Sequence, residues 1–104
     1  MLKNMLVLAL SPTLIMASFM TMAADPDAGK AKFATCAGCH GAKGVSVAPS
    51  YPTLAGKDAA YIKEALTAYK SGTRANATMK AMAAGLSEAD IDNIAAYVAS
   101  FPKP

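Results

Sequence analysis

Residues 35–41 read Thr-Cys-Ala-Gly-Cys-His-Gly, and this string decides the fold expected of the chain. It contains the CxxCH pattern of covalent haem attachment. On a helical turn the thiols of Cys36 and Cys39 face the same way, so both can add to vinyl groups along one edge of a haem and form thioethers. His40 then lies beneath the porphyrin, where an imidazole nitrogen can ligate the iron. The small residues between the cysteines let the backbone approach the ring closely.

Two other chemistries use the same cysteine spacing. A redox disulfide of the thioredoxin type expects strands that alternate with helices, and the sequence has no run of alternating β-branched and polar residues. A zinc site is unfavourable, because adjacent Cys39 and His40 make an awkward chelate and no second ligand pair exists. The chain has a single histidine, which excludes HExxH hydrolases and bis-histidine haem ligation. Haem attachment is therefore the interpretation that we adopt, with a haem-free thiol redox module as an alternative.

The N-terminus has the pattern of a secretory signal peptide. Residues 1–23 hold one charge, Lys3, followed by apolar runs and then by small residues. We expect cleavage after Ala23 or Ala24, which leaves residues 24–104 as the folded domain of an exported, periplasmic bacterial protein. The alternative is an uncleaved anchor, since the apolar stretch approaches the ~20 residues of a membrane-spanning helix, although a proline interrupts it. After cleavage we expect no stable membrane insertion.

The length and charge balance of the chain limit its partners. Ten Lys and Arg against seven Asp and Glu give a net charge of +3, which is too weak and too scattered for nucleic-acid binding. A length of 104 residues allows one domain. So short a domain buries a small core and is expected to need an additional stabilising element, which a covalently bound haem would supply.

The spacing of apolar residues predicts three helical segments and an all-α fold. The first segment begins at Asp25 or Asp27, either of which can cap exposed backbone amides. The second begins near Asp58. The third follows the capping-box spacing of residues 87–90 and ends before Pro102.

Segments 41–56 and 73–85 are predicted to be loops. The first is rich in Gly, Pro and Ser but also carries apolar residues, and the second is polar at first and then holds two methionines. Long loops in a small domain usually carry function. The expected architecture is three to four helices wrapped around one haem.

Residues 25–101 resemble a class I c-type cytochrome, in particular the small bacterial monohaem members and one half of the dihaem periplasmic ones. The resemblance rests on Gly29 and Phe33 in the first helix and on four further stretches: TCAGCHG, APSYPTLAGK, the methionine-containing loop and GLSEADIDNIAAYVASF. It implies the class I cytochrome c fold, in which Gly29 and Phe33 pack across the last helix near Tyr97.

The resemblance also implies the ligands of the iron. A methionine thioether suits haem iron opposite a histidine, and Met79 and Met82 remain after removal of the signal. The resemblance favours Met79 as the distal axial ligand, with Met82 as the runner-up and His40 as the proximal ligand. It further implies that the backbone carbonyl of Pro49 accepts a hydrogen bond from the second imidazole nitrogen of His40.

Other residues are interpreted as surroundings of the haem. Five apolar or aromatic side chains are expected to form the pocket wall: Tyr51, Leu54, Ile62, Leu66 and Tyr69. Lys43 lies beside the attachment motif and Lys80 beside Met79, so both are candidates for cations around an exposed haem edge that steer partners.

An iron with both axial positions filled has no vacancy for a substrate, so we expect an electron-transfer protein and not an enzyme. The resemblance implies a soluble periplasmic carrier in a respiratory chain. It would accept single electrons from a membrane quinol-oxidising complex or a dehydrogenase and pass them to a terminal oxidase or reductase. The alternative is a ligand-binding or peroxidatic haem protein, in which the sulfur bond is absent or labile.

Overall fold

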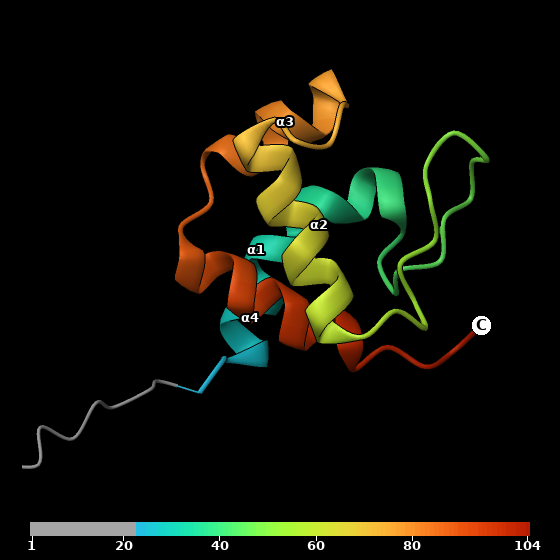
Figure 1. The fold of residues 1–104 in the computed structure, drawn as a ribbon. Helices are drawn as coiled ribbons and strands as arrows, with labels where there is room; N and C mark the ends of the chain where they lie inside the picture. Colours follow the sequence, from blue (N-terminus) through green and yellow to red (C-terminus); the bar gives the residue numbers. More distant parts are fainter. Residues whose placement is uncertain (1–22) are drawn as a thin grey trace, which may run out of the picture.

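The computed structural model describes residues 23–104, so the expected signal peptide lies, except for its last residue, outside the described residues. The described chain folds into four helices (Figure 1), which are α1 (Pro26–His40), α2 (Ala59–Ser71), α3 (Ala77–Ala84) and α4 (Glu88–Ala99). This part of the chain contains no strand, as the predicted all-α class requires. None of its helices is long and apolar enough to cross a membrane.

Side-chain caps set the starts of the three predicted helices. Asp25 caps α1 and Asp58 caps α2, each by accepting a hydrogen bond from a backbone N–H of the first turn, at 2.9 and 2.7 Å. At α4 the Ser87 hydroxyl accepts from the N–H of Asp90, and the Asp90 carboxylate accepts from the N–H of Ser87, both at 3.0 Å. This is the predicted capping box.

Helix α3 corrects the prediction of a loop over residues 73–85. The side chain of Asn76 caps the helix by accepting a hydrogen bond from the N–H of Met79 at 2.9 Å. The helix itself is composed mainly of Ala, Met and Lys, which are good helix formers. Only one of its side chains, Ala83, is buried. The cap and the composition of this segment account for the helix that the sequence analysis missed.

The close crossing of α1 and α4 is confirmed. A Cβ atom added to Gly29 would lie 2.0 Å from the carbonyl oxygen of Asn93, so only glycine allows the two backbones to approach this closely. Beside the crossing, the ring of Phe33 makes edge contacts with Tyr97 and Phe101, at centroid distances of 5.5 and 5.4 Å. The expected packing of Gly29 and Phe33 across the last helix is thus present.

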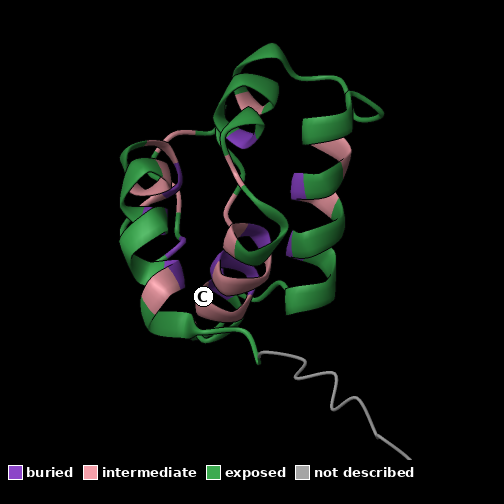
Figure 2. Cartoon of the chain, turned by 90° about the vertical axis from the view of Figure 1, so that its left-hand side faces the viewer, coloured by how far each residue is buried: buried purple, intermediate pink, exposed green. Residues whose placement is uncertain are grey.

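The core lies where α1, α2 and α4 meet, and Figure 2 shows its buried residues on the inward sides of the helices. It consists of Phe33, Ile62, Leu66, Ile91, Ile94, Ala95 and Val98. Among the described helices, α3 packs only against α2, above the end of that helix in Figure 1. Helix α3 therefore lies at the edge of the core and not within it.

Segment 41–56 is a loop that folds back on itself beside the end of α1. The carbonyl of Gly44 accepts hydrogen bonds from the N–H groups of Leu54 and Ala55, at 2.7 and 3.0 Å. Gly44 has a φ of 73°, and a Cβ atom there would lie 2.7 Å from a ring carbon of Phe101. These contacts fix the base of the loop and pack it against the residues that follow α4.

Candidate haem-binding site

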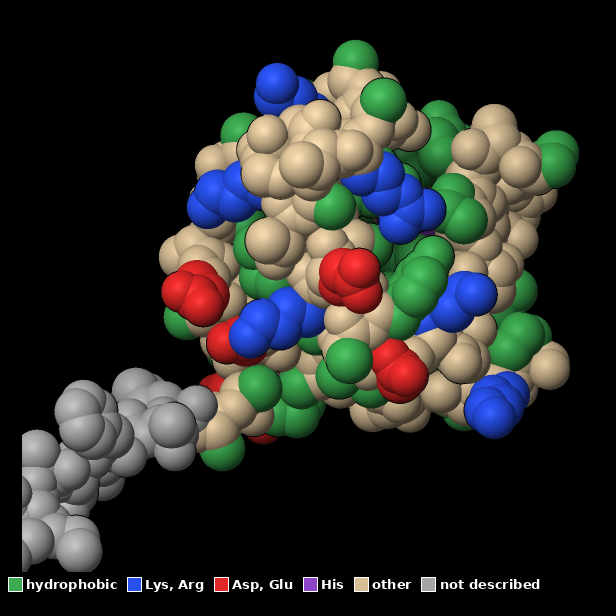
Figure 3. All heavy atoms as spheres, in the orientation of Figure 1, with side chains coloured by type: hydrophobic (Ala, Val, Ile, Leu, Met, Phe, Trp, Pro, Cys, Tyr) green, Lys and Arg blue, Asp and Glu red, His purple; other side chains and the backbone are tan. Residues whose placement is uncertain are grey.

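A cavity of about 500 Å³ lies between the end of α1, helices α2 and α3, and the loop 41–56. Figure 3 shows it as a recess walled by hydrophobic side chains, with Lys and Arg side chains at its rim. A volume of this size and a mainly apolar lining are typical of pockets that enclose a cofactor. Cys36, Cys39, His40, Met79 and Met82 all line this cavity, so the predicted site residues are brought together.

The attachment motif forms the last turns of α1. Cys36 and Cys39 are half-buried, unpaired thiols on the wall of the cavity, and His40 is the last residue of the helix. His40 is also the one polar side chain among the buried residues that the structure describes, at 6% exposure. Within residues 23–104, no group of three or more His, Cys, Asp and Glu side chains is placed to hold a metal ion.

The ring of His40 is oriented by Pro52 and not by Pro49, which corrects the prediction. The Nδ1 atom of His40 lies 2.8 Å from the carbonyl oxygen of Pro52. A carbonyl can only accept, so Nδ1 carries the proton and Nε2 keeps its lone pair for a metal. The reason for the difference is a turn in the loop, in which the N–H of Tyr51 donates to the carbonyl of Ala48 at 3.1 Å. This turn places Pro49 at an exposed bend and brings Pro52 to the histidine.

The electrostatics of the thiols argue against the thioredoxin-type alternative. Burial raises the pKa of the Cys36 thiol, and the neighbouring Cys39 raises it further. Redox-active cysteines of that type instead have lowered pKa values that expose a reactive thiolate at neutral pH. Cys36 is therefore held as a neutral thiol in an apolar wall, an environment suited to a group that becomes a thioether.

Helix α3 supplies the two methionines to the cavity, one turn apart. Met79 is half-buried and packs against the hydrophobic core. Met82 is 40% exposed. Both side chains line the cavity, but the degree of burial places Met79 towards the interior and Met82 towards the mouth. The structure thus favours the order of the two candidates that the resemblance implies.

The predicted wall residues all line the cavity, whereas the two predicted cations do not. Tyr51, Leu54, Ile62, Leu66 and Tyr69 all line the cavity. Lys43 and Lys80 do not, and the basic residues that line it are Lys57 and Arg74.

Each of these two cations lies over an aromatic ring of α2. The ammonium of Lys57 is 5.0 Å from the ring centre of Tyr61, and the guanidinium of Arg74 is 4.9 Å from that of Tyr69. Tyr61 follows Lys57 by four residues at the start of α2, a spacing that could have indicated the first pair. Arg74 lies beyond the end of α2, and its place at the mouth depends on how the chain turns there.

These residues fit a haem. The cavity offers two thiols on one wall, a buried imidazole with a free nitrogen beside them, a thioether on another helix and apolar surface between. No other set of described residues combines these features.

Comparison with known proteins agrees with this fit. The family model Cytochrome c matches residues 26–102. The chain is 46% identical over 81 residues to cytochrome c-554(548) of Halomonas halodenitrificans, which covers 75% of this chain and 98% of that protein. It is 40% identical over 97 residues to cytochrome c4 of Pseudomonas aeruginosa, which covers 93% of this chain and 48% of that protein.

A solved structure shows the same fold. The reduced recombinant cytochrome c4 of Pseudomonas stutzeri aligns with a TM-score of 0.74 and 36% identity, over 79% of this chain and 48% of that one. The chain thus spans about half the length of the cytochromes c4 and nearly the whole of cytochrome c-554(548). With the CxxCH motif at the cavity and the family model across all four helices, this chain belongs to the cytochrome c family and is a haem-based electron carrier with covalently bound haem c.

Proposed function

We propose that this protein carries single electrons in the periplasm, with its haem bound through thioethers to Cys36 and Cys39 and its iron ligated by His40 and Met79. The observation that carries the proposal is that these four side chains, from α1 and α3, line one apolar cavity. The haem, when bound, supplies a reversible one-electron couple. The residues of the chain decide what that couple is used for.

If protein side chains fill both axial positions of the iron, the haem can transfer electrons but cannot bind a substrate. The Pro52 carbonyl holds His40 in the tautomer that presents Nε2, and α3 holds a soft thioether at the same cavity. Two protein ligands leave no position for a substrate, so the protein is not an enzyme under this proposal. A His and Met ligand pair also favours a raised reduction potential.

The mouth of the cavity is proposed as the face that meets redox partners. Tyr51, Tyr61 and Met82 are each about two-fifths exposed and line the cavity, at 41%, 41% and 40%. Lys57 and Arg74 add positive charge beside them. An apolar centre with basic residues around it favours partners whose docking face carries acidic side chains.

Donors and acceptors are proposed by class. One relative is the thiosulfate dehydrogenase electron acceptor of Stutzerimonas stutzeri. It is 41% identical to this chain over 70 residues, and the match covers 32% of that relative. This name supports a dehydrogenase as a donor class, beside a membrane quinol-oxidising complex. A terminal oxidase or reductase of the respiratory chain is the proposed acceptor. Export by residues 1–23, with cleavage after Ala23 or Ala24, would place the domain 24–104 in the compartment where such partners act.

The proposal is tested by expressing the full chain in a bacterium that matures c-type cytochromes. We expect intact mass of the periplasmic product to equal residues 24–104 or 25–104 plus one haem. We expect the ferric protein to show the weak absorption band near the red end of the visible spectrum that reports iron to methionine sulfur bonding. A mass equal to the polypeptide alone would overturn the proposal.

The axial ligand is tested with a matched pair of variants. Met79→Ala should lose the weak band and bind carbon monoxide rapidly in the ferrous state. Met82→Ala, on the same helix and in the same cavity, should keep the band. Loss of the band in Met82→Ala alone would reassign the ligand, and absence of the band from the unmodified protein would favour the ligand-binding alternative.

A further inference from the structure

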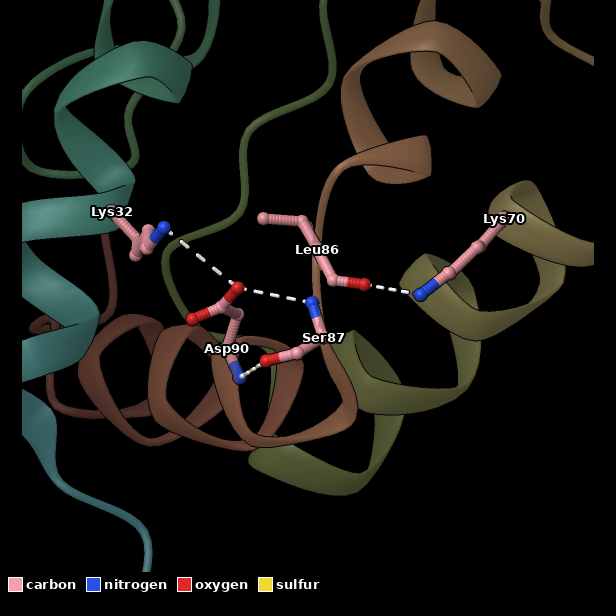
Figure 4. Close-up of polar contacts among 5 residues, drawn as sticks. All are labelled: Lys32, Lys70, Leu86, Ser87 and Asp90. Atoms are coloured by element: carbon pink, nitrogen blue, oxygen red, sulfur yellow. Dashed lines mark hydrogen bonds and ion pairs between the residues drawn. The ribbon is translucent and has the colours of Figure 1, made fainter.

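The segment that carries both methionines is closed at its base by the last turn of α2. Lys70, in that turn, donates a hydrogen bond from its ammonium to the backbone carbonyl of Leu86 (Figure 4). At the other end of the segment, the N–H of Arg74 and the hydroxyl of Thr73 both donate to the carbonyl of Ala68, at 3.2 and 3.3 Å. Residues 71–86 therefore leave α2 and return to it as a closed loop, with α3 at its far side.

Helix α3 has few contacts with the rest of the described chain, apart from the packing of Met79 against the hydrophobic core. Among the described helices it packs only against α2, and Ala83 is its one buried side chain. The position of the thioether of Met79 at the cavity therefore depends on α2, on the contact of Met79 with the core and on the two connections at the ends of α3. One of these connections is Gly85–Ser87.

Contacts from three helices fix the connection between α3 and α4. Lys70 of α2 holds the carbonyl of Leu86, and Asp90 of α4 holds the N–H of Ser87 at 3.0 Å. The Asp90 carboxylate in turn lies 3.8 Å from the ammonium of Lys32 in α1. Figure 4 shows these groups around the two adjacent residues of the connection. Of these contacts, the one from Lys70 is the one that joins the connection to α2, the helix on which α3 rests.

We propose that Lys70 is a positioning residue for the axial methionine: by binding the carbonyl of Leu86, it closes the 71–86 segment and holds Met79 at the cavity. This inference rests on the proposed role of Met79 as iron ligand. Lys70 itself does not line the cavity. Its effect acts through the position of α3, so it should change how firmly the thioether is held and not the identity of the ligand.

The test uses the haem-loaded full domain and two matched alanine variants on α2. Lys70→Ala removes the contact with Leu86. Lys63→Ala removes the same charge from the same helix, but its ammonium pairs with Asp92 of α4, at 2.8 Å, away from the methionine segment. The measurements are the rate of imidazole binding to the ferric protein and the denaturant concentration at which the weak methionine band disappears, with far-UV circular dichroism as the measure of global unfolding.

We expect Lys70→Ala to bind imidazole about fivefold faster than the parent, as the loss of one net hydrogen bond predicts. Its band should also disappear at a lower denaturant concentration, well before helix unfolding. Lys63→Ala should bind imidazole at the same rate as the parent. Lys70→Arg can still donate to the carbonyl of Leu86, so its rate of imidazole binding should also be that of the parent. Equal rates in Lys70→Ala and Lys63→Ala would overturn the inference. A parent protein without the band would instead overturn the ligand assignment on which it rests.

Discussion

The Nδ1 atom of His40 and the carbonyl oxygen of Pro52 lie 2.8 Å apart, which joins the last residue of α1 to the loop 41–56. This contact decides which imidazole nitrogen faces the cavity. It also makes the conformation of a loop, and not of a helix, responsible for the orientation of the residue proposed as the proximal ligand.

Loosening the loop at position 52 should change the reduction potential. Pro52→Gly keeps the carbonyl but removes the proline ring that restrains its position against Nδ1 of His40. The hydrogen bond from Nδ1 raises the basicity of Nε2, the nitrogen proposed to ligate the iron, so a weaker bond should lower that basicity. We expect the potential to rise and the free energy of unfolding to fall by about 1 kcal/mol. Pro49→Gly is the control, because Pro49 lies at an exposed bend. Protein-film voltammetry on both variants measures the difference, and an equal shift in the two would contradict the role of Pro52.

Gly29→Ala should separate α1 from α4. The added Cβ atom would lie 2.0 Å from the carbonyl oxygen of Asn93, so the two backbones must move apart. We expect a loss of about 3 kcal/mol of unfolding free energy in urea titrations, the upper part of the usual range for overpacking. Lys30→Ala, at the adjacent exposed position, should change stability by less than about 0.5 kcal/mol. A Gly29→Ala domain as stable as the parent would show that the helices are not in the close contact described.

The Ser87 hydroxyl of the capping box should contribute to the stability of the domain at neutral pH. Ser87→Ala removes the hydroxyl that accepts from the N–H of Asp90 and should cost about 1 kcal/mol at neutral pH. Thr67→Ala, an exposed hydroxyl within α2, serves as the control and should have a small effect.

The loss of unfolding free energy at acidic pH should depend on Asp90. The hydrogen bond from the Ser87 backbone N–H is the main cause that lowers the pKa of Asp90, and the nearby Lys32 and Lys70 lower it further. A carboxyl with a lowered folded pKa stabilises the fold above its unfolded pKa, about 3.9, and this contribution is lost as pH falls through the folded pKa. Urea titrations from pH 7 to pH 3 should therefore show a smaller acid loss in Asp90→Asn than in the parent. Parallel curves would indicate that Asp90 has its ordinary pKa.

The cations at the mouth should steer partners. Lys57→Gln and Arg74→Gln should each slow association with an acidic redox partner several-fold at low ionic strength and weaken the salt dependence of the rate. Lys30→Gln removes the same charge from a position outside the cavity and should have a smaller effect. Stopped-flow electron transfer over a range of salt concentrations provides the measurement. Equal effects of all three variants would mean that only net charge matters.

Removal of the haem should unfold the domain. The buried core is small, and the cavity of about 500 Å³ would be left as apolar surface in contact with water. A Cys36→Ala, Cys39→Ala double variant, expressed without covalent haem, should show little helical circular dichroism. Addition of free haem should restore part of that signal through His40 and Met79. A well-dispersed NMR spectrum of the haem-free chain would contradict this expectation.

Features encoded by neighbouring residues could be predicted from the sequence. The caps at Asp25, Asp58 and Ser87 depend on residues at most three positions apart, so their spacing alone specifies them. The attachment motif is likewise a local pattern, since Cys36, Cys39 and His40 occupy the last turns of one helix. The all-helical fold, the haem and the family all follow from such local signals.

Other features were decided by the tertiary structure. The turn after Ala48 determines that Pro52, and not Pro49, reaches the histidine, because loop residues cannot be placed by counting along the chain. The course of the chain around the cavity determines that Lys57 and Arg74 line its mouth. The sequence by itself determined the chemistry of this protein, because that chemistry depends on residues that share one helix. Tertiary packing alone decided what surrounds and orients the site, because those contacts join distant segments whose relative positions no local spacing records.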